Sequence, residues 1–147
     1  MVGETNTAGV AGLGEEVFRT IPEAAEFVAK LLWKASENGF SPDDLHAIRL
    51  ALEEAFRNAF SHGNANDPGK CVRVSWAVGK AEFNISIRDE GSGFDPKSVP
   101  DPTSPERLSE PSGRGLYLMR SYMEVVKHED CGRVVRMLYR RRGWRRE

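Results

Sequence analysis

The chain has 147 residues, of which 39% are hydrophobic and 29% are charged, and its formal net charge is −1. This length suits one domain, and the hydrophobic fraction is too high for a disordered chain. A nearly neutral protein has no global field that would draw it to nucleic acid or to an acidic membrane. Only the end of the chain, residues 140–147, is strongly basic, and we expect it to be a solvated tail.

Cysteine usage and the start of the chain predict a cytoplasmic protein. Cys71 and Cys131 lie far apart, and neither belongs to a Cys-x-x-Cys pair, so zinc binding and thioredoxin-like chemistry have no support. Residues 1–14 lack the basic start and apolar run of a secretion signal, and no segment approaches the length of a membrane span. We expect residues 1–14 to form a loose leader.

The first half of the chain predicts an edge strand and two helices. A short strand is expected within residues 15–21, and Pro22 suits the first turn of a helix that ends at Gly39. A second helix is expected from Ser41 to Gly63. Ser41 can cap it, and the proline and two aspartates that follow suit the start of a helix. The apolar residues at helical spacing are Ala25, Val28, Ala29, Leu32 and Trp33 in the first helix and Leu45, Ile48, Leu52, Ala55 and Ala59 in the second.

The second half of the chain predicts strands in pairs. Residues 72–76 and 83–87 alternate apolar and polar side chains around a Gly-Lys turn, which predicts an antiparallel hairpin. A final pair of strands is expected at residues 125–126 and 134–138. Between the two pairs, residues 90–112 are too long and too polar for a routine connection, so they form a candidate functional loop.

A third helix is expected around residues 116–123, after that loop. Helices followed by strands, with one inserted helix, predict a single α+β domain over residues 15–139. Its architecture should be a two-layer sandwich, in which helices cover one face of a mostly antiparallel sheet.

Glu54, Asn58 and His62 form the first cluster of chemical interest, because a spacing of four residues places them on one helix face. A carboxylate and a carboxamide stacked in this way can hold a hydrated magnesium ion together with a water or hydroxyl group. The same spacing is also common on solvated polar helix faces, and the cluster alone leaves that alternative open.

The second cluster is residues 89–94, directly after a β-type run. Asp89 at the strand end can accept a hydrogen bond from an exocyclic amine such as that of adenine. Gly91 and Gly93 let the backbone pass close to a flat base. The alternative is an ordinary turn, since aspartate, glycine and serine are all turn residues.

The third cluster, residues 113–119, opens the third helix with Gly113, Arg114 and Gly115. Glycines there expose backbone N–H groups at the positive helix end, which suits phosphates, whereas the alternative is a glycine-rich hinge. The cluster is not a P-loop, because Gly-Lys-Ser/Thr is absent. It is not a dinucleotide fingerprint, because no parallel β-α-β unit precedes it.

Together, in this order, the three clusters resemble the N, G1 and G2 boxes of the ATPase superfamily that includes gyrase, Hsp90, sensor histidine kinases and MutL. The resemblance runs from about Ile21 to Leu138. It is closest to the anti-sigma-factor serine kinases, short stand-alone domains that share the Glu-Ala-x-x-Asn-Ala…His-Gly helix and the Gly-x-Gly-Leu…Met segment. It implies a Bergerat-type fold that binds ATP and magnesium. It also implies a homodimer joined through the first helix and the first strand.

The resemblance implies a role for each matching residue. Glu54 would be the general base that acts on a protein serine or threonine hydroxyl, and Asn58 would ligate the magnesium ion. Asp89 would hold the adenine amino group, and residues 90–112 would form the lid over ATP. The full nucleotide-binding set is Asn58, Asp89, Gly91, Gly93, Phe94, Gly113, Arg114, Gly115 and Leu116.

One position departs from the family pattern, which often has a threonine after a glycine in the last strands, near the adenine. Here Gly132 is followed by Arg133 and two valines, with no hydroxyl group. A water molecule or another group must then assist Asp89, or adenine affinity is reduced.

The function implied is that of an anti-sigma factor and serine/threonine kinase, which phosphorylates a small antagonist protein and switches between that antagonist and a sigma factor. The alternative is a module that binds ATP only to set its shape and inhibits a partner without phosphate transfer. Glu54 favours the kinase, because binding alone requires no base. A sensor histidine kinase fragment is disfavoured, since no phospho-accepting helix pair precedes the domain and His46 and His128 have no metal-like companions.

Overall fold

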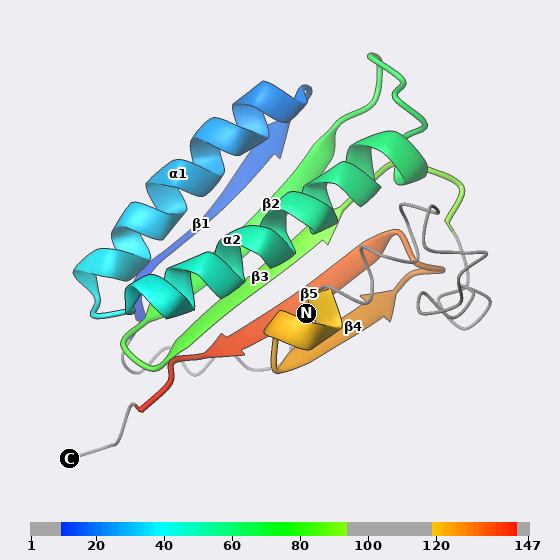
Figure 1. The fold of residues 1–147 in the computed structure, drawn as a ribbon. Helices are drawn as coiled ribbons and strands as arrows, with labels where there is room; N and C mark the ends of the chain where they lie inside the picture. Colours follow the sequence, from blue (N-terminus) through cyan, green and yellow to red (C-terminus); the bar gives the residue numbers. More distant parts are fainter. Residues whose placement is uncertain (1–9, 94–118, 144–147) are drawn as a thin grey trace, which may run out of the picture.

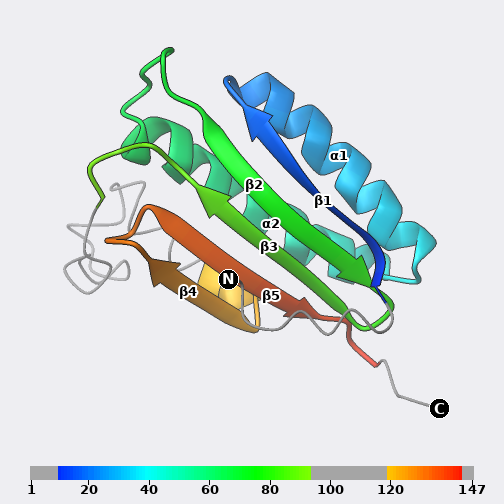
Figure 2. The same ribbon diagram turned by 180° about the vertical axis from the view of Figure 1, so that it is seen from behind.

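The computed structural model describes residues 10–93 and 119–143, which form two layers (Figure 1). The elements are β1 (Val10–Phe18), α1 (Ile21–Glu37), α2 (Pro42–Arg57), the π-helix η1 (Asn58–Gly63), β2 (Val72–Gly79), β3 (Glu82–Arg88), β4 (Val125–Glu129) and β5 (Val134–Arg140). The strands form one sheet in the order β1-β2-β3-β5-β4, and every neighbouring pair is antiparallel. Both long helices lie on the same face of this sheet, and Figure 2 shows the opposite face. The predicted α+β sandwich is confirmed.

The edge strand β1 starts five residues before the predicted boundary at residue 15 and ends at Phe18. Val10 already pairs with Gly79 of β2, so residues 10–14 belong to the sheet and not to a loose leader. The ladder continues through Gly12 and Gly14, which have no side chains to reveal the alternation of a strand. The Trp76 side chain of β2 packs against both glycines.

α1 has the predicted ends but a different buried face. The Thr20 side chain accepts a hydrogen bond from the Glu23 N–H, and Gly39 follows the helix with a φ of 96°. The buried residues are Ala24, Phe27, Val28, Leu31 and Ala35. Trp33, by contrast, is 70% exposed. Contact between the Phe27 and Phe18 rings, whose centroids lie 5.0 Å apart, turns the helix away from the predicted stripe.

α2 begins as the sequence predicts and is joined to the end of β5 by a buried polar pair. Ser41 and Asp44 form a capping box, and most of the predicted stripe is buried, with Leu45 only partly so. The Tyr139 hydroxyl donates to Asp44 Oδ1 at 2.5 Å. Burial raises the pKa of Asp44, but hydrogen bonds from Tyr139, Ser41 and Arg142 more than offset it and leave this pKa below its ordinary value. The pair therefore stabilises the fold above about pH 4 and is lost as the pH falls through the lower folded-state pKa.

Part of the basic segment expected to be a solvated tail is attached to the fold. Arg140 closes β5, and the Arg141 N–H donates to the carbonyl of Ala81 at 2.8 Å. The Arg141 guanidinium also donates to the carbonyls of Asn38 and Lys80. These bonds fasten the chain beside the turn that connects α1 and α2.

The two predicted strand pairs are both present and longer than expected. β2 and β3 form the first hairpin, and β4 and β5 form the second. Register pairing of Arg88 with Val134 places the end of β3 beside the start of β5. Of the predicted third helix, residues 119–122 are helical and Met123 lies beyond the helix end, whereas residues 94–118 lie outside the described residues.

Candidate functional site

The second helix changes its winding at Asn58. From this residue to Gly63 it is a π-helix, and the Asn64 N–H donates to the carbonyl of Ala59, five residues earlier, at 2.9 Å. The sequence predicted the end at Gly63 but not the change of winding. Single π-turns inside α-helices are frequent at functional sites.

Glu54 and Asn58 lie on either side of this change and are both largely withdrawn from solvent. The Glu54 side chain is only 14% exposed, and its Oε1 lies 3.1 Å from Arg57 Nη1. Asn58 Oδ1 is buried and has no hydrogen-bond partner within the described ranges. A buried carbonyl without a partner costs about 1–3 kcal/mol, and amide oxygens are ligands that magnesium accepts. His62, predicted on the same face, is exposed.

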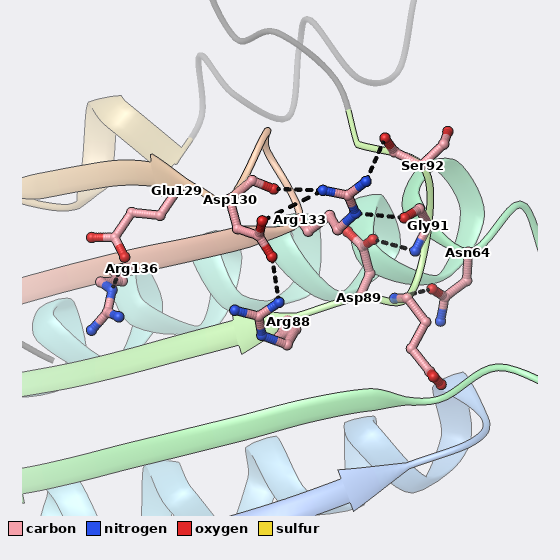
Figure 3. A network of polar contacts seen from close by, with 10 residues as sticks. Asn64, Arg88, Asp89, Gly91, Ser92, Glu129, Asp130, Arg133 and Arg136 are labelled. Atoms are coloured by element: carbon pink, nitrogen blue, oxygen red, sulfur yellow. Dashed lines mark hydrogen bonds and ion pairs between the residues drawn. The ribbon is translucent and has the colours of Figure 1, made fainter. Parts of the chain in front are cut away.

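Asp89 follows β3 and is buried, with 7% of its surface exposed. Its N–H donates to the carbonyl of Arg133 at 2.9 Å. Its Oδ1 accepts from the Gly91 N–H at 2.8 Å, as Figure 3 shows. Burial raises the pKa of Asp89 above its ordinary value. The Gly91 bond and the charges of Arg133, Arg88 and Lys70 oppose this rise without cancelling it.

Three glycines allow three chain segments to meet around Asp89. A Cβ atom on Gly63 would overlap the Asp89 carboxyl group, and one on Gly91 would overlap the carbonyl of Gly63. Gly93 has a φ of 86°, and a Cβ there would overlap the carbonyl of Cys131. The end of η1, the loop after β3 and the turn between β4 and β5 therefore come into backbone contact. We name these three residues the glycine cradle.

Asn64 is a site residue that sequence reasoning missed. It is 1% exposed, its Oδ1 accepts from the Glu90 N–H at 2.7 Å, and its Nδ2 donates to the carbonyl of Cys71 at 3.0 Å. Glu90 Oε1 in turn accepts from the Cys71 N–H at 2.6 Å. Asn64 thereby ties the end of η1 to the loop after β3 and to the segment before β2. A polar residue after a helix-ending glycine carries no sequence signal of burial.

The role of Arg133 is the second feature that sequence reasoning missed, since the sequence showed only that this residue lacks a hydroxyl group. Its Nε donates to the carbonyl of Gly91 at 2.8 Å, and its Nη2 donates to that of Ser92 at 3.1 Å (Figure 3). Its Nη1 donates to the carbonyl of Asp130 at 3.2 Å, and Asp130 Oδ2 pairs with Arg88 at 2.6 Å. The chain thus has an arginine at the position where a family threonine was expected, and it contacts the loop carbonyls.

The structure brings the first two predicted clusters together through the contact of Gly63 with Asp89. Five predicted nucleotide-binding residues, Phe94, Gly113, Arg114, Gly115 and Leu116, lie outside the described residues, as do positions 94–112 of the expected lid. In the described ranges no three histidine, cysteine, aspartate or glutamate residues group as a metal site. A search of the same ranges found no helix long and apolar enough to cross a membrane.

The sequence profile of the histidine kinase-like ATPase domain family matches residues 18–139. The chain belongs to this family. As a member of an ATPase family, the domain uses ATP. Its matched range includes Glu54, Asn58, the glycine cradle, Asp89 and Arg133.

Serine-protein kinases named RsbW are among the proteins to which this histidine kinase-like ATPase domain is similar. The serine-protein kinase RsbW of Bacillus licheniformis is 36% identical over 111 residues, which cover 70% of this chain and 69% of that protein. RsbW of Bacillus cereus strain AH187 is 27% identical over 123 residues, which cover 77% and 76% of the two chains.

A solved structure supports the fold alone. The crystal structure of the RsbU and RsbW domains of a Mycobacterium tuberculosis protein matches with a TM-score of 0.56 and 20% identity. The match covers 90% of this chain and 32% of that longer one.

Asp89→Asn tests whether Asp89 binds the nucleobase, as the sequence predicts. We expect ATP to bind roughly tenfold or more weakly, because a hydrogen bond to a charged group contributes about 1.5–3 kcal/mol. In the unchanged protein, ATP affinity should fall on acidification through the raised pKa of Asp89, since a protonated carboxyl accepts hydrogen bonds poorly. The variant should lack this acid-dependent loss. Calorimetric titration at several pH values measures both effects.

The same substitution should not lower the free energy of unfolding at neutral pH. A raised folded-state pKa means that the buried charge costs stability above that pKa, and asparagine removes this cost. Asp67→Asn, in an exposed turn, is the matched control. An ATP affinity that is unchanged in Asp89→Asn would show that Asp89 does not bind the nucleotide.

Proposed function

We propose that this protein is a serine/threonine protein kinase that uses magnesium ATP to phosphorylate a small anti-sigma-factor antagonist, and that it also binds a sigma factor. The observation that carries the proposal is the buried, unpartnered Oδ1 of Asn58, one turn along the helix from the largely buried Glu54. The RsbW relatives, named as serine-protein kinases, support the same conclusion. Sigma factors act on transcription, so we place the protein in the cytoplasm.

Asp89 is the residue that we assign to the nucleobase. Its carboxylate would accept a hydrogen bond from the exocyclic amine of adenine, with Gly91, Gly93 and Phe94 beside the base. Burial supports this role, because a charged acceptor shielded from water forms a stronger hydrogen bond. The triphosphate is assigned to Gly113, Arg114, Gly115 and Leu116, at the start of the predicted third helix.

Asn58 is the residue that we assign to magnesium. Its Oδ1 has the chemistry that this ion accepts and is not used by any described residue. A single protein ligand is compatible with magnesium, which usually retains several waters and binds phosphate oxygens. Bound there, the ion would neutralise charge on the ATP phosphates.

Glu54 is the proposed general base. Its carboxylate would take the proton from the serine or threonine hydroxyl of the antagonist while that oxygen bonds to the γ-phosphorus. The bond between the γ-phosphorus and the bridging oxygen breaks, and ADP leaves. Arg57 Nη1 lies 3.1 Å from Oε1 and would help to orient the carboxylate. Positioning of this kind supplies most of the catalysis in phosphoryl transfer.

Glu54→Gln tests the base. We expect phosphate transfer to fall by roughly 10²–10⁴-fold, the usual contribution of general base catalysis, while the Kd for ATP changes little. Intact-mass measurement of a candidate antagonist after incubation with magnesium ATP reports the transfer, and calorimetry reports binding. Glu53→Gln is the matched control, because Glu53 is exposed and pairs only loosely with Arg49, at 4.0 Å.

Transfer by Glu54→Gln at the rate of the unchanged protein would exclude Glu54 as the base. ATP-dependent binding of the antagonist without any gain of phosphate, even in the unchanged protein, would favour the non-catalytic module.

We also propose that the protein forms a homodimer through β1 and α1. Among the described residues, the large apolar side chains that are exposed concentrate there: Leu13, Val17, Ile21 and Trp33, with Val125 as the exception. Leu13 is 66% and Trp33 is 70% exposed. Leu13 and Val17 share the face of β1 opposite to that of Phe18, which packs on α1, whereas Trp33 lies on the surface of α1 itself. Exposed large apolar side chains commonly mark protein contacts.

Sedimentation velocity tests the dimer. The unchanged protein should sediment as a dimer at micromolar concentration, and Leu13→Ser combined with Trp33→Ser should shift it to the monomer by removing apolar contact area. Val125→Ser is the matched control, because Val125 is exposed on β4, at the opposite edge of the sheet. A monomeric unchanged protein, or a double variant that remains dimeric, would contradict this interface.

A further inference from the structure

Arg133 closes a ring of hydrogen bonds around the proposed base-binding carboxylate. The Asp89 N–H donates to the carbonyl of Arg133, and Asp89 Oδ1 accepts from the Gly91 N–H. The carbonyl of Gly91 then accepts from Arg133 Nε at 2.8 Å. Each of the three residues is therefore bonded to the other two. Figure 3 shows the bonds that Gly91 makes with Asp89 and with Arg133. The orientation of the Asp89 carboxylate depends on where Gly91 is held.

The loop after β3 needs such a restraint because of its composition. Gly91 and Gly93 have wide backbone freedom, and their lack of side chains is required by the glycine cradle. Arg133 donates to the carbonyls of two successive residues, 91 and 92. A planar guanidinium presents several donors in a fixed fork, so it can fix two carbonyls at once, whereas the single ammonium of lysine cannot reproduce this geometry.

The guanidinium is itself anchored. Its Nη1 donates to the carbonyl of Asp130 and lies 3.5 Å from Asp130 Oδ1. The other carboxylate oxygen of Asp130 pairs with Arg88 at 2.6 Å. We name the guanidinium of Arg133, with its bonds to the carbonyls of Gly91 and Ser92, the clamp. The Arg133 side chain is 31% exposed, so the clamp lies at the surface of the site and its removal leaves no buried cavity. Loss of the clamp should therefore affect the loop more than the core.

We propose that Arg133 is a positioning residue for adenine. It fixes the carbonyls of Gly91 and Ser92, and through Gly91 it orients the Asp89 carboxylate toward the exocyclic amine of the base. It acts through the backbone and does not itself contact the nucleotide. This inference rests on the proposed assignment of Asp89 to adenine.

Calorimetric titration of ATP and of GTP in the presence of magnesium separates this role from a general loss of structure. The two nucleotides share the triphosphate, but GTP has a carbonyl oxygen where ATP has the amine. We expect Arg133→Ala to weaken ATP binding about tenfold, in line with loss of charged hydrogen bonds, and to leave GTP binding within about twofold. Arg133→Lys keeps the charge but not the fork, and it should restore only a minor part of the ATP affinity.

Arg136→Ala is the matched control. Arg136 lies three residues further along, in β5, and pairs with Glu129 at 2.7 Å, away from Gly91 (Figure 3). The Arg136→Ala variant should bind ATP and GTP with the same affinities as the unchanged protein. Adding Arg133→Ala to Asp89→Asn should cause little further loss of ATP affinity, because the clamp acts through that carboxylate.

Four results would overturn the proposal: equal ATP affinity in Arg133→Ala and Arg136→Ala, an equal loss for ATP and GTP, full recovery with lysine, or losses that multiply in the double variant. Should Arg133→Ala fail to fold, Arg133→Lys carries the same comparison. An unchanged protein that does not prefer ATP to GTP would overturn the Asp89 assignment along with this one. A clear preference that Arg133→Ala retains would overturn the role of Arg133 alone.

Discussion

The burial of the Asp89 carboxylate is the constraint on which the rest of the site depends. Burying a carboxylate is unfavourable unless hydrogen bonds and charges compensate, and here the compensation is incomplete, since the pKa of Asp89 stays raised. The surrounding segments must come close enough to shield it from water while leaving it able to accept a hydrogen bond. This requirement accounts for Gly63, Gly91 and Gly93, where any side chain would push the segments apart.

The fold supplies these segments from three distant parts of the sequence. The π-helix carries Gly63 to the carboxyl group, and Asn64, one residue later, bonds to the loop that follows β3. The antiparallel register of β3 and β5 sets Asp89 beside Arg133. The site therefore forms only when helix, hairpin and sheet are all in place.

The same arrangement links the base-binding and catalytic parts of the proposed site. Glu54 and Asn58 belong to the helix whose end contacts Asp89, so one continuous element spans both. Asn58 is the first residue of the π-helix, and its unpartnered Oδ1 lies where the winding changes. In this account, the helix positions the metal ligand and the base relative to the nucleobase without a separate loop.

The sequence was most informative where local chemistry determines structure. The Ser41 cap, the two hairpins and the stripe around Ile48 and Leu52 follow from capping and periodicity, and the structure has them all. Asp89 could be singled out because it follows a strand and precedes two glycines.

Features that depend on distant contacts were not predictable. The buried face of α1 follows from the contact of Phe27 with Phe18, and residues 10–14 join the sheet only because β2 pairs with them. Asn64 and Arg133 look like ordinary surface residues in the sequence, because the groups to which they bond lie up to 42 residues away. The change to π winding at Asn58 has no local signal either.

A crystal structure of the protein with magnesium and a non-hydrolysable ATP analogue tests the central claim most directly. The account predicts a carboxylate oxygen of Asp89 within about 3.2 Å of the exocyclic amine of adenine, in the usual range for such a hydrogen bond. Adenine bound elsewhere, with Asp89 making no contact to the nucleotide, would contradict it.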